Sequence, residues 1–117
     1  MRLTSVTVGT SQPRELAGFY ARLLGASVGA VEDDWAQVRV PGGLTLNFEF
    51  EACFRRPVWP SVDGAQTASQ HLDIEVDDLG SAVEHALACG AVLAQVQPQE
   101  DVRVLIDPDG HPFCLFL

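Results

Sequence analysis

The chain has 117 residues and a formal net charge of −9, from 16 acidic and 7 basic residues. This length fits one domain, and 47 % hydrophobic residues with 20 % charged residues are enough for a packed core. The acidic balance argues against nucleic acid as a partner, because nucleic-acid binding requires a basic patch. The protein class that remains is an acidic globular domain.

The sequence gives no reason to expect a membrane or secreted protein. No apolar run reaches the roughly 18 residues of a membrane helix, and the opening MRLTSVTV is too polar for a signal peptide. The three cysteines, Cys53, Cys89 and Cys114, show no metal-site spacing and are expected to be reduced thiols. We therefore expect a cytoplasmic protein with no membrane partner.

The first part of the chain predicts a strand, a helix and three more strands. A strand over residues 2–8 precedes a helix over 13–24, whose first position is Pro13. Short strands follow over 27–32 and 35–40. A turn at 41–43 leads to the clearest strand, 44–51, in which apolar and polar residues alternate without a break.

The second part of the chain repeats this plan. In residues 70–76 the apolar face alternates with His71, Asp73 and Glu75. Asp77 or Asp78 can cap the following helix, which Gly90 ends. Strands are then expected over 92–96, 102–105 and 112–117. The Pro-rich segment 52–69, which contains Trp59, is interpreted as a linker that can also cover a site.

The two parts therefore each predict a β-α-β-β-β module, over residues 1–51 and 70–117 of a single domain. Ser5 in the first module corresponds to His71 in the second. Val38-Arg39-Val40 recurs as Val102-Arg103-Val104, and Gly43 before LTLNF matches Gly110 before HPFCLF. The order of these matches favours an internal repeat.

Three stretches, PRELAGFYARLLGA, HLDIEVDDLGSAVEHALACGA and DPDGHPFCLF, resemble the vicinal oxygen chelate superfamily. Its members include lactoylglutathione lyases, extradiol dioxygenases, fosfomycin-modifying enzymes and bleomycin-resistance proteins. Within the superfamily, the sequences of these stretches are most similar to those of small glyoxalase-like proteins. The resemblance implies an α+β fold in which two βαβββ modules form a cup-shaped, mixed eight-stranded sheet with helices on the convex side. It also implies a homodimer.

The resemblance also implies a divalent metal, held by four side chains on the concave face of the sheet. The corresponding positions here are Ser5, Asn47, His71 and Cys114, and two of them depart from the usual histidine and glutamate. A register slip would place Glu49 at the last-strand position of the first module. Zinc could then use Glu49, His71 and Cys114. Nickel, iron or manganese could also bind. Because Ser5 and Cys114 replace the usual histidine and glutamate, however, we expect a site without a metal.

Strand alternation predicts the lining of the concave face. If the valines of the Val-Arg-Val segments face the helices, Arg39 and Arg103 face inward, as do Gln37 and Leu105. The two arginines could clamp an acid group or could neutralise carboxylates of the same face. Candidate ligand-binding residues are Ser5, Trp35, Arg39, Asn47, Arg103, Cys114 and Phe116.

Two functions are compatible with this lining. The first is binding of a small organic molecule without a catalytic metal, as in bleomycin-resistance proteins. The alternative is a divalent-metal-dependent lyase, isomerase or dioxygenase. Candidate catalytic residues are His71, as a general base, and Glu49. His71 could instead only hydrogen-bond Glu49 or Asp73.

Overall fold

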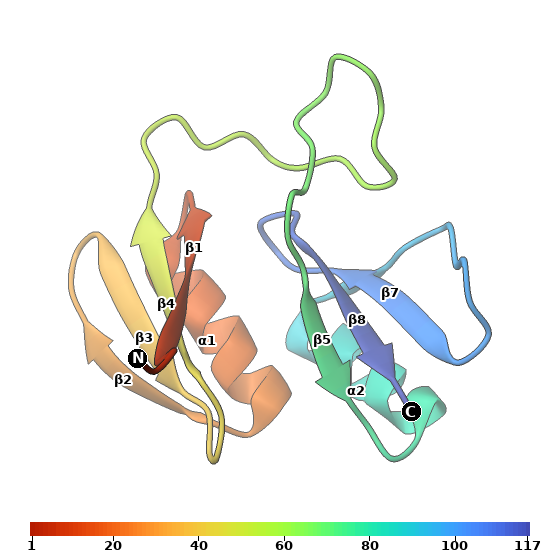
Figure 1. Cartoon of the computed structure of the whole chain (residues 1–117), viewed down its shortest axis with the longest axis horizontal. Helices are drawn as coiled ribbons and strands as arrows, with labels where there is room; N and C mark the ends of the chain where they lie inside the picture. The colour runs from red at the N-terminus through yellow and green to blue at the C-terminus, as the bar shows by residue number, and fades with distance from the viewer. The chain divides into compact units, whose positions relative to one another are not determined.

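The structure is a computed structural model that describes all 117 residues as two compact units, Met1–Phe54 and Arg55–Leu117. Each unit contains one helix and one sheet, which can be followed in Figure 1. The first unit contains β1 (Ser5–Thr10), α1 (Pro13–Leu24), β2 (Ser27–Val31), β3 (Trp35–Arg39) and β4 (Thr45–Phe50). The second contains β5 (Leu72–Glu75), α2 (Leu79–Cys89), β6 (Val92–Leu93), β7 (Val102–Ile106) and β8 (Pro112–Phe116).

Each module forms its own four-stranded mixed sheet, with strand order β1-β4-β3-β2 in the first and β5-β8-β7-β6 in the second. The outer pair β1–β4, like β5–β8, is parallel, and the other pairs are antiparallel. The predicted α+β fold with two βαβββ modules is confirmed. An eight-stranded cup made from both sheets stays a prediction.

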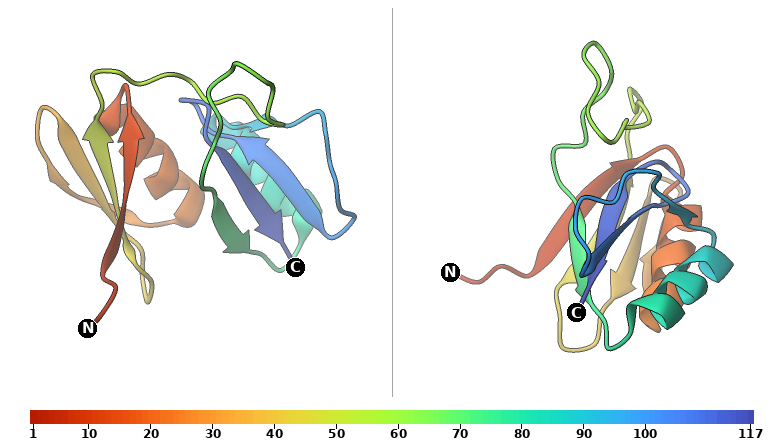
Figure 2. Two further views of the ribbon diagram at one scale, coloured as in Figure 1. Left: turned by 45° about the horizontal axis from the view of Figure 1, so that its top comes forward. Right: turned by 90° about the vertical axis from the view of Figure 1, so that its right-hand side faces the viewer.

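The core of the first unit lies between α1 and one face of its sheet, as Figure 2 shows. Tyr20 of α1 stacks on Phe48 of β4, with ring centroids 5.3 Å apart, and Phe19 packs edge-on against Tyr20. The helix begins at Pro13 and ends at Gly25, whose φ of 59° allows the left-handed turn that stops it. The predicted helix boundaries are therefore confirmed.

The core of the second unit is smaller. Ala86 is the only α2 residue that is fully buried, and it faces a sheet that buries Leu105, Phe113 and Leu115. Asp78 caps α2, because its carboxylate accepts a hydrogen bond of 2.7 Å from the Ser81 backbone N–H. No helix of the protein is long and apolar enough to cross a membrane.

Strand pairing defines which residues of the two modules are equivalent. Thr7 of β1 lies opposite Asn47 of β4, and Asp73 of β5 lies opposite Cys114 of β8. Asn47 and Cys114 thus hold the same position in their modules, as the sequence predicted. The register slip that would bring Glu49 to this position is not present.

The predicted match between the two Val-Arg-Val segments is wrong. Arg39 ends β3 and Ile106 ends β7, and in both modules five residues separate this strand from the next. Ile106 is therefore the equivalent of Arg39. Arg103 lies three residues earlier, at the place of Ala36, whose side chain is buried under α1.

The turn between β7 and β8 is organised by a buried carboxylate. Asp107 has a fully buried side chain that accepts hydrogen bonds from the backbone N–H groups of Asp109 and His111, at 2.9 and 3.0 Å. The His111 ring nitrogen Nδ1 lies 2.9 Å from the same carboxylate. An aspartate that binds the backbone two residues ahead is typical of tight turns.

The cap of α2 gives a testable prediction. Hydrogen bonds from the Ser81 backbone and hydroxyl lower the pKa of Asp78, so its stabilisation is present above the ordinary aspartate pKa and is lost as the pH falls through the lowered value. Asp78→Ala should lower the thermal midpoint at neutral pH, and the difference from wild type should shrink in acid.

The matched control is Asp77→Ala, because Asp77 is also exposed and precedes the cap by one residue. It should leave the midpoint nearly unchanged. Equal losses of thermal stability in the two variants would contradict the assignment of the cap to Asp78.

Candidate functional site

The face of the second sheet that points away from α2 carries three of the candidate residues, His71, Cys114 and Phe116. Residues directly opposite each other on paired strands share a face, and successive residues alternate. Because Phe113 and Leu115 face the core, the opposite face carries Pro112, Cys114 and Phe116 of β8. From the neighbouring strands it carries His71, Asp73, Glu75, Val102, Val104 and Ile106.

Three side chains of this face form a polar cluster, His71, Asp73 and Cys114. His71 Nε2 lies 3.3 Å from Asp73 Oδ1, and both side chains are more than half exposed. The donor atoms of the three residues all lie within 4.8 Å of one another. Since the surrounding β7 and β8 side chains are apolar, the cluster is a local concentration of hydrogen-bonding groups on an apolar face.

Cys114 is a protonated thiol in this setting. Burial raises its pKa, and the negative charge of Asp73 and a hydrogen bond to that carboxylate raise it further. A thiol is a poor nucleophile and a poor metal ligand until it loses its proton. The Cys114 thiol is therefore suited to hydrogen bonding and apolar contact.

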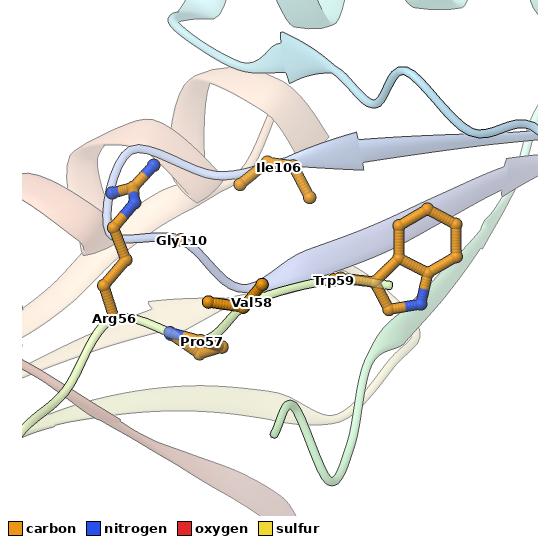
Figure 3. Close-up of a pocket in the computed structure, with 6 residues that line it drawn as sticks. All are labelled: Arg56, Pro57, Val58, Trp59, Ile106 and Gly110. Atoms are coloured by element: carbon orange, nitrogen blue, oxygen red, sulfur yellow. The ribbon is translucent and has the colours of Figure 1, made fainter. Parts of the chain in front are cut away.

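A pocket of about 350 Å³ lies at one end of this sheet, between the chain segment 56–59 and the β7–β8 turn. Figure 3 shows its lining, which consists of Arg56, Pro57, Val58, Trp59, Ile106 and Gly110. Ile106 shares the sheet face of Cys114. Residues 56–59 of the Pro-rich segment form one wall of this pocket, and a covering role for the segment stays a prediction.

The first sheet presents a different polar face, opposite α1. There Arg39 Nε donates to Gln37 Oε1 at 3.4 Å. Gln37 Nε2 donates in turn to Asn47 Oδ1 at 3.3 Å, and Asn47 Nδ2 donates to Thr7 Oγ1 at 3.4 Å. Strand pairing places Trp35 and Ser5 on this face as well. These hydrogen bonds define a polar row, and Glu49, which pairs with Trp35, adds a carboxylate to the same face.

Arg103 and Leu105 do not face inward, and this prediction is wrong. Arg103 pairs with Leu115 and Leu105 pairs with Phe113, so both lie on the face that α2 covers. Arg103 Nη1 donates to the backbone carbonyls of Gln99, Glu100 and Val102, at 3.3, 2.9 and 2.7 Å. It secures the loop before β7 and neither clamps an acid nor neutralises a carboxylate of the sheet.

The carboxylate next to His71 and Cys114 is Asp73, which the sequence placed on this face but not among the metal ligands. Glu49, predicted as the carboxylate ligand, belongs to the first unit and pairs with Trp35. Within its unit the partner of His71 is Asp73, and the role of His71 as a general base stays a prediction. The alternation of residues 71–75 contained this signal.

The donor set of the cluster fits zinc better than other divalent metals. Zinc accepts histidine nitrogen, carboxylate oxygen and thiolate sulfur together. Non-haem iron requires two histidines and a carboxylate, and manganese prefers oxygen ligands. At the equivalent position of the first module, Thr7 and Asn47 offer only a hydroxyl and an amide.

Comparison with known proteins places these modules in context. Residues 5–116 match the family model described as a glyoxalase-like domain. No curated protein sequence matches the chain with significance. Among solved structures, a glyoxalase/bleomycin resistance protein/dioxygenase family enzyme from Burkholderia phytofirmans PsJN has a TM-score of 0.75 and 16% identity, covering 98% of this chain and 97% of that chain.

Two other solved structures are similar over nearly their full length. A possible glyoxalase from Bacillus cereus has a TM-score of 0.74 and 10% identity, covering 100% of this chain and 99% of that chain. The fosfomycin resistance protein FosX from Listeria monocytogenes has a TM-score of 0.73 and 13% identity, with coverage of 99% and 92%. At these identities the likeness shows the fold.

The electrostatics of the cluster predict the reactivity of its thiol. Because burial and Asp73 both raise the pKa of Cys114, this residue should be alkylated at pH 8 more slowly than exposed Cys53. Asp73→Asn removes the nearby charge and should accelerate alkylation of Cys114, measured by mass spectrometry of labelled peptides.

Glu75→Gln is the control, because Glu75 lies two residues further along the same face and opposite Phe116. It removes the same charge from the sheet but does not touch the thiol. If both substitutions accelerate labelling equally, the effect comes from net charge and the contact of Asp73 with Cys114 is unimportant.

Proposed function

Because the chain belongs to the glyoxalase-like domain family, we propose that it binds a small organic molecule on the face of the second sheet opposite α2, without a catalytic metal. One observation carries this proposal: His71, Asp73 and Cys114 converge on a sheet face that is otherwise largely apolar. A few placed polar groups on an apolar surface are typical of small-molecule sites.

The cluster offers three different hydrogen-bonding groups to a ligand. Asp73 orients the His71 ring through the 3.3 Å contact and leaves the other ring nitrogen available. The Cys114 thiol is half-buried and can contact either polar or apolar atoms. Phe116 supplies an aromatic surface two residues further along β8, on the same face.

Two properties of the cluster support a metal-free site: its thiol is protonated, and its histidine already contacts its aspartate. Metal binding would require the Cys114 thiolate, whereas burial and Asp73 raise the pKa of this thiol. It would also have to displace the contact between His71 and Asp73. A homodimer and a cytoplasmic location belong to the same proposal, on the basis of the family resemblance and the reduced cysteines.

The second candidate function is a zinc-dependent lyase, isomerase or dioxygenase. It is favoured by the short distances among three possible ligand atoms. The nitrogen of His71, the oxygen of Asp73 and the sulfur of Cys114 all lie within 4.8 Å of one another. Zinc held by these residues would supply a Lewis acid. A FosX variant has been crystallised with Mn(II) and 1S,2S-dihydroxypropylphosphonic acid. The thiol of Cys114 distinguishes the present donor set from the oxygen-rich sets that manganese prefers.

Elemental analysis separates the two functions. Protein purified without a histidine tag should contain far less than one zinc, nickel, iron or manganese per chain. About one zinc per chain, retained after dialysis and lost in His71→Ala but not in His85→Ala, would overturn the metal-free proposal. His85 is a suitable control because it is an exposed histidine on α2, in the same unit.

Thermal-shift screening with small organic molecules tests binding itself, since a ligand of the folded state raises the melting temperature. For any ligand found, His71→Ala should weaken binding about tenfold, the effect of losing one hydrogen bond to a polar or charged group. His85→Ala should bind as wild type does. Unchanged affinity in both His71→Ala and Asp73→Asn would exclude the cluster from the site.

A further inference from the structure

We propose that the pocket lined by residues 56–59, Ile106 and Gly110 binds a small organic acid, with Arg56 recognising the anionic group and Trp59 contacting the apolar body (Figure 3). This inference rests on the proposed function in taking the ligand to be a small molecule. It adds the chemical class of that molecule and a cation that the sequence analysis did not single out.

Arg56 is held in place by the β7–β8 turn. Its Nη1 donates a hydrogen bond of 3.0 Å to the carbonyl oxygen of Pro108. Its aliphatic stem crosses Gly110, where an added Cβ would overlap the Arg56 Cγ. Gly110 also has a φ of 102°, which disfavours any side chain. The turn thus leaves a space that only the arginine fills.

Within the second unit, no carboxylate neutralises the charge of Arg56. Arg14 has such a partner, since its guanidinium lies 2.7 Å from Asp33. Arg56 has only the Pro108 carbonyl, although acidic residues outnumber basic ones 16 to 7 in the chain. A guanidinium carries five N–H donors in a planar fork that suits carboxylates and phosphonates. The unused donors are available to an anion.

The rest of the pocket is apolar. Val58 and Ile106 lie between the Arg56 guanidinium and the Trp59 indole, which stand at opposite ends of the lining in Figure 3. A volume of about 350 Å³ is at the small end of the range for small-molecule sites. This arrangement matches a molecule with one acidic end and a compact apolar or aromatic body.

Residues 56–59, which form one wall of the pocket, are held in place by hydrogen bonding to a later part of the same segment. The Val58 backbone N–H donates to the Gln66 carbonyl oxygen at 2.8 Å, and Val58 forms an isolated bridge with Thr67. The pocket also adjoins the polar cluster, because Ile106 and Val104 share one face of β7 and Val104 pairs with Cys114. The pocket and the cluster thus lie on one face of the sheet, and none of His71, Asp73 and Cys114 lines the pocket itself.

The test compares two probes of the same shape, phenylacetate and phenylacetamide. Binding is followed in the ¹⁵N-labelled protein through the indole N–H signal of Trp59, assigned with a Trp59→Phe variant. Phenylacetate should shift this signal saturably and bind about fivefold to tenfold more tightly than the amide, because only the carboxylate forms a charge-assisted pair with Arg56. Added salt should reduce this preference.

Arg56→Gln should bind the two probes equally, whereas Arg55→Gln should keep the preference for the carboxylate. Arg55 is the matched control because it is the neighbouring exposed arginine and does not line the pocket. The backbone spectra establish that both variants are folded.

Absence of a saturable shift with phenylacetate, equal affinities of the two probes for wild type, or equal losses in the two arginine variants would each overturn the inference. The proposed function fails by a different result. If ligands from the thermal-shift screen are weakened by His71→Ala but not by Arg56→Gln, the cluster remains a binding site and only the role of Arg56 is wrong.

Discussion

The register of β8 between its two neighbours is the constraint on which the second module depends. Asp73 lies opposite Cys114 on one side and Val104 lies opposite it on the other. A slip of one residue would turn Cys114 toward α2 and expose Phe113, whose side chain is fully buried. The burial of Phe113 and Leu115 therefore fixes the face on which the polar cluster forms. The chemistry of the outer face is positioned by hydrophobic packing on the inner one.

The two modules use one geometry for different chemistry. In the first, the paired positions Thr7 and Asn47 carry neutral groups that hydrogen-bond to each other. In the second, the same positions are Asp73 and Cys114, where burial and the negative charge of Asp73 raise the pKa of the Cys114 thiol. A thiol beside a carboxylate thus occupies this position in the second module but not in the first. The fold is shared with fosfomycin-resistance and glyoxalase-like proteins, but it does not determine which side chains occupy these positions. Function depends on those side chains, which the scaffold only positions.

Periodicity in the sequence predicted most of the fold, and its failures have local causes. Proline and glycine mark both ends of α1, and unbroken alternation marks β4, so these elements were predicted closely. Arg103 was misplaced because a match of three residues was given more weight than the equal turns that follow β3 and β7. In β7, Val104 and Leu105 are both buried, so alternation there carries no information about the face. Arg56 was missed because its role depends on the space above Gly110, a tertiary contact across more than fifty residues.

The buried carboxylate of Asp107 has a consequence for how a ligand meets this protein. The turn that it organises is ordered during folding, so its conformational entropy is lost before any ligand arrives. Ile106 and Gly110, which line the pocket, belong to the backbone that this turn organises. Association then requires little induced fit on this side, and the affinity reflects contacts more than loop closure.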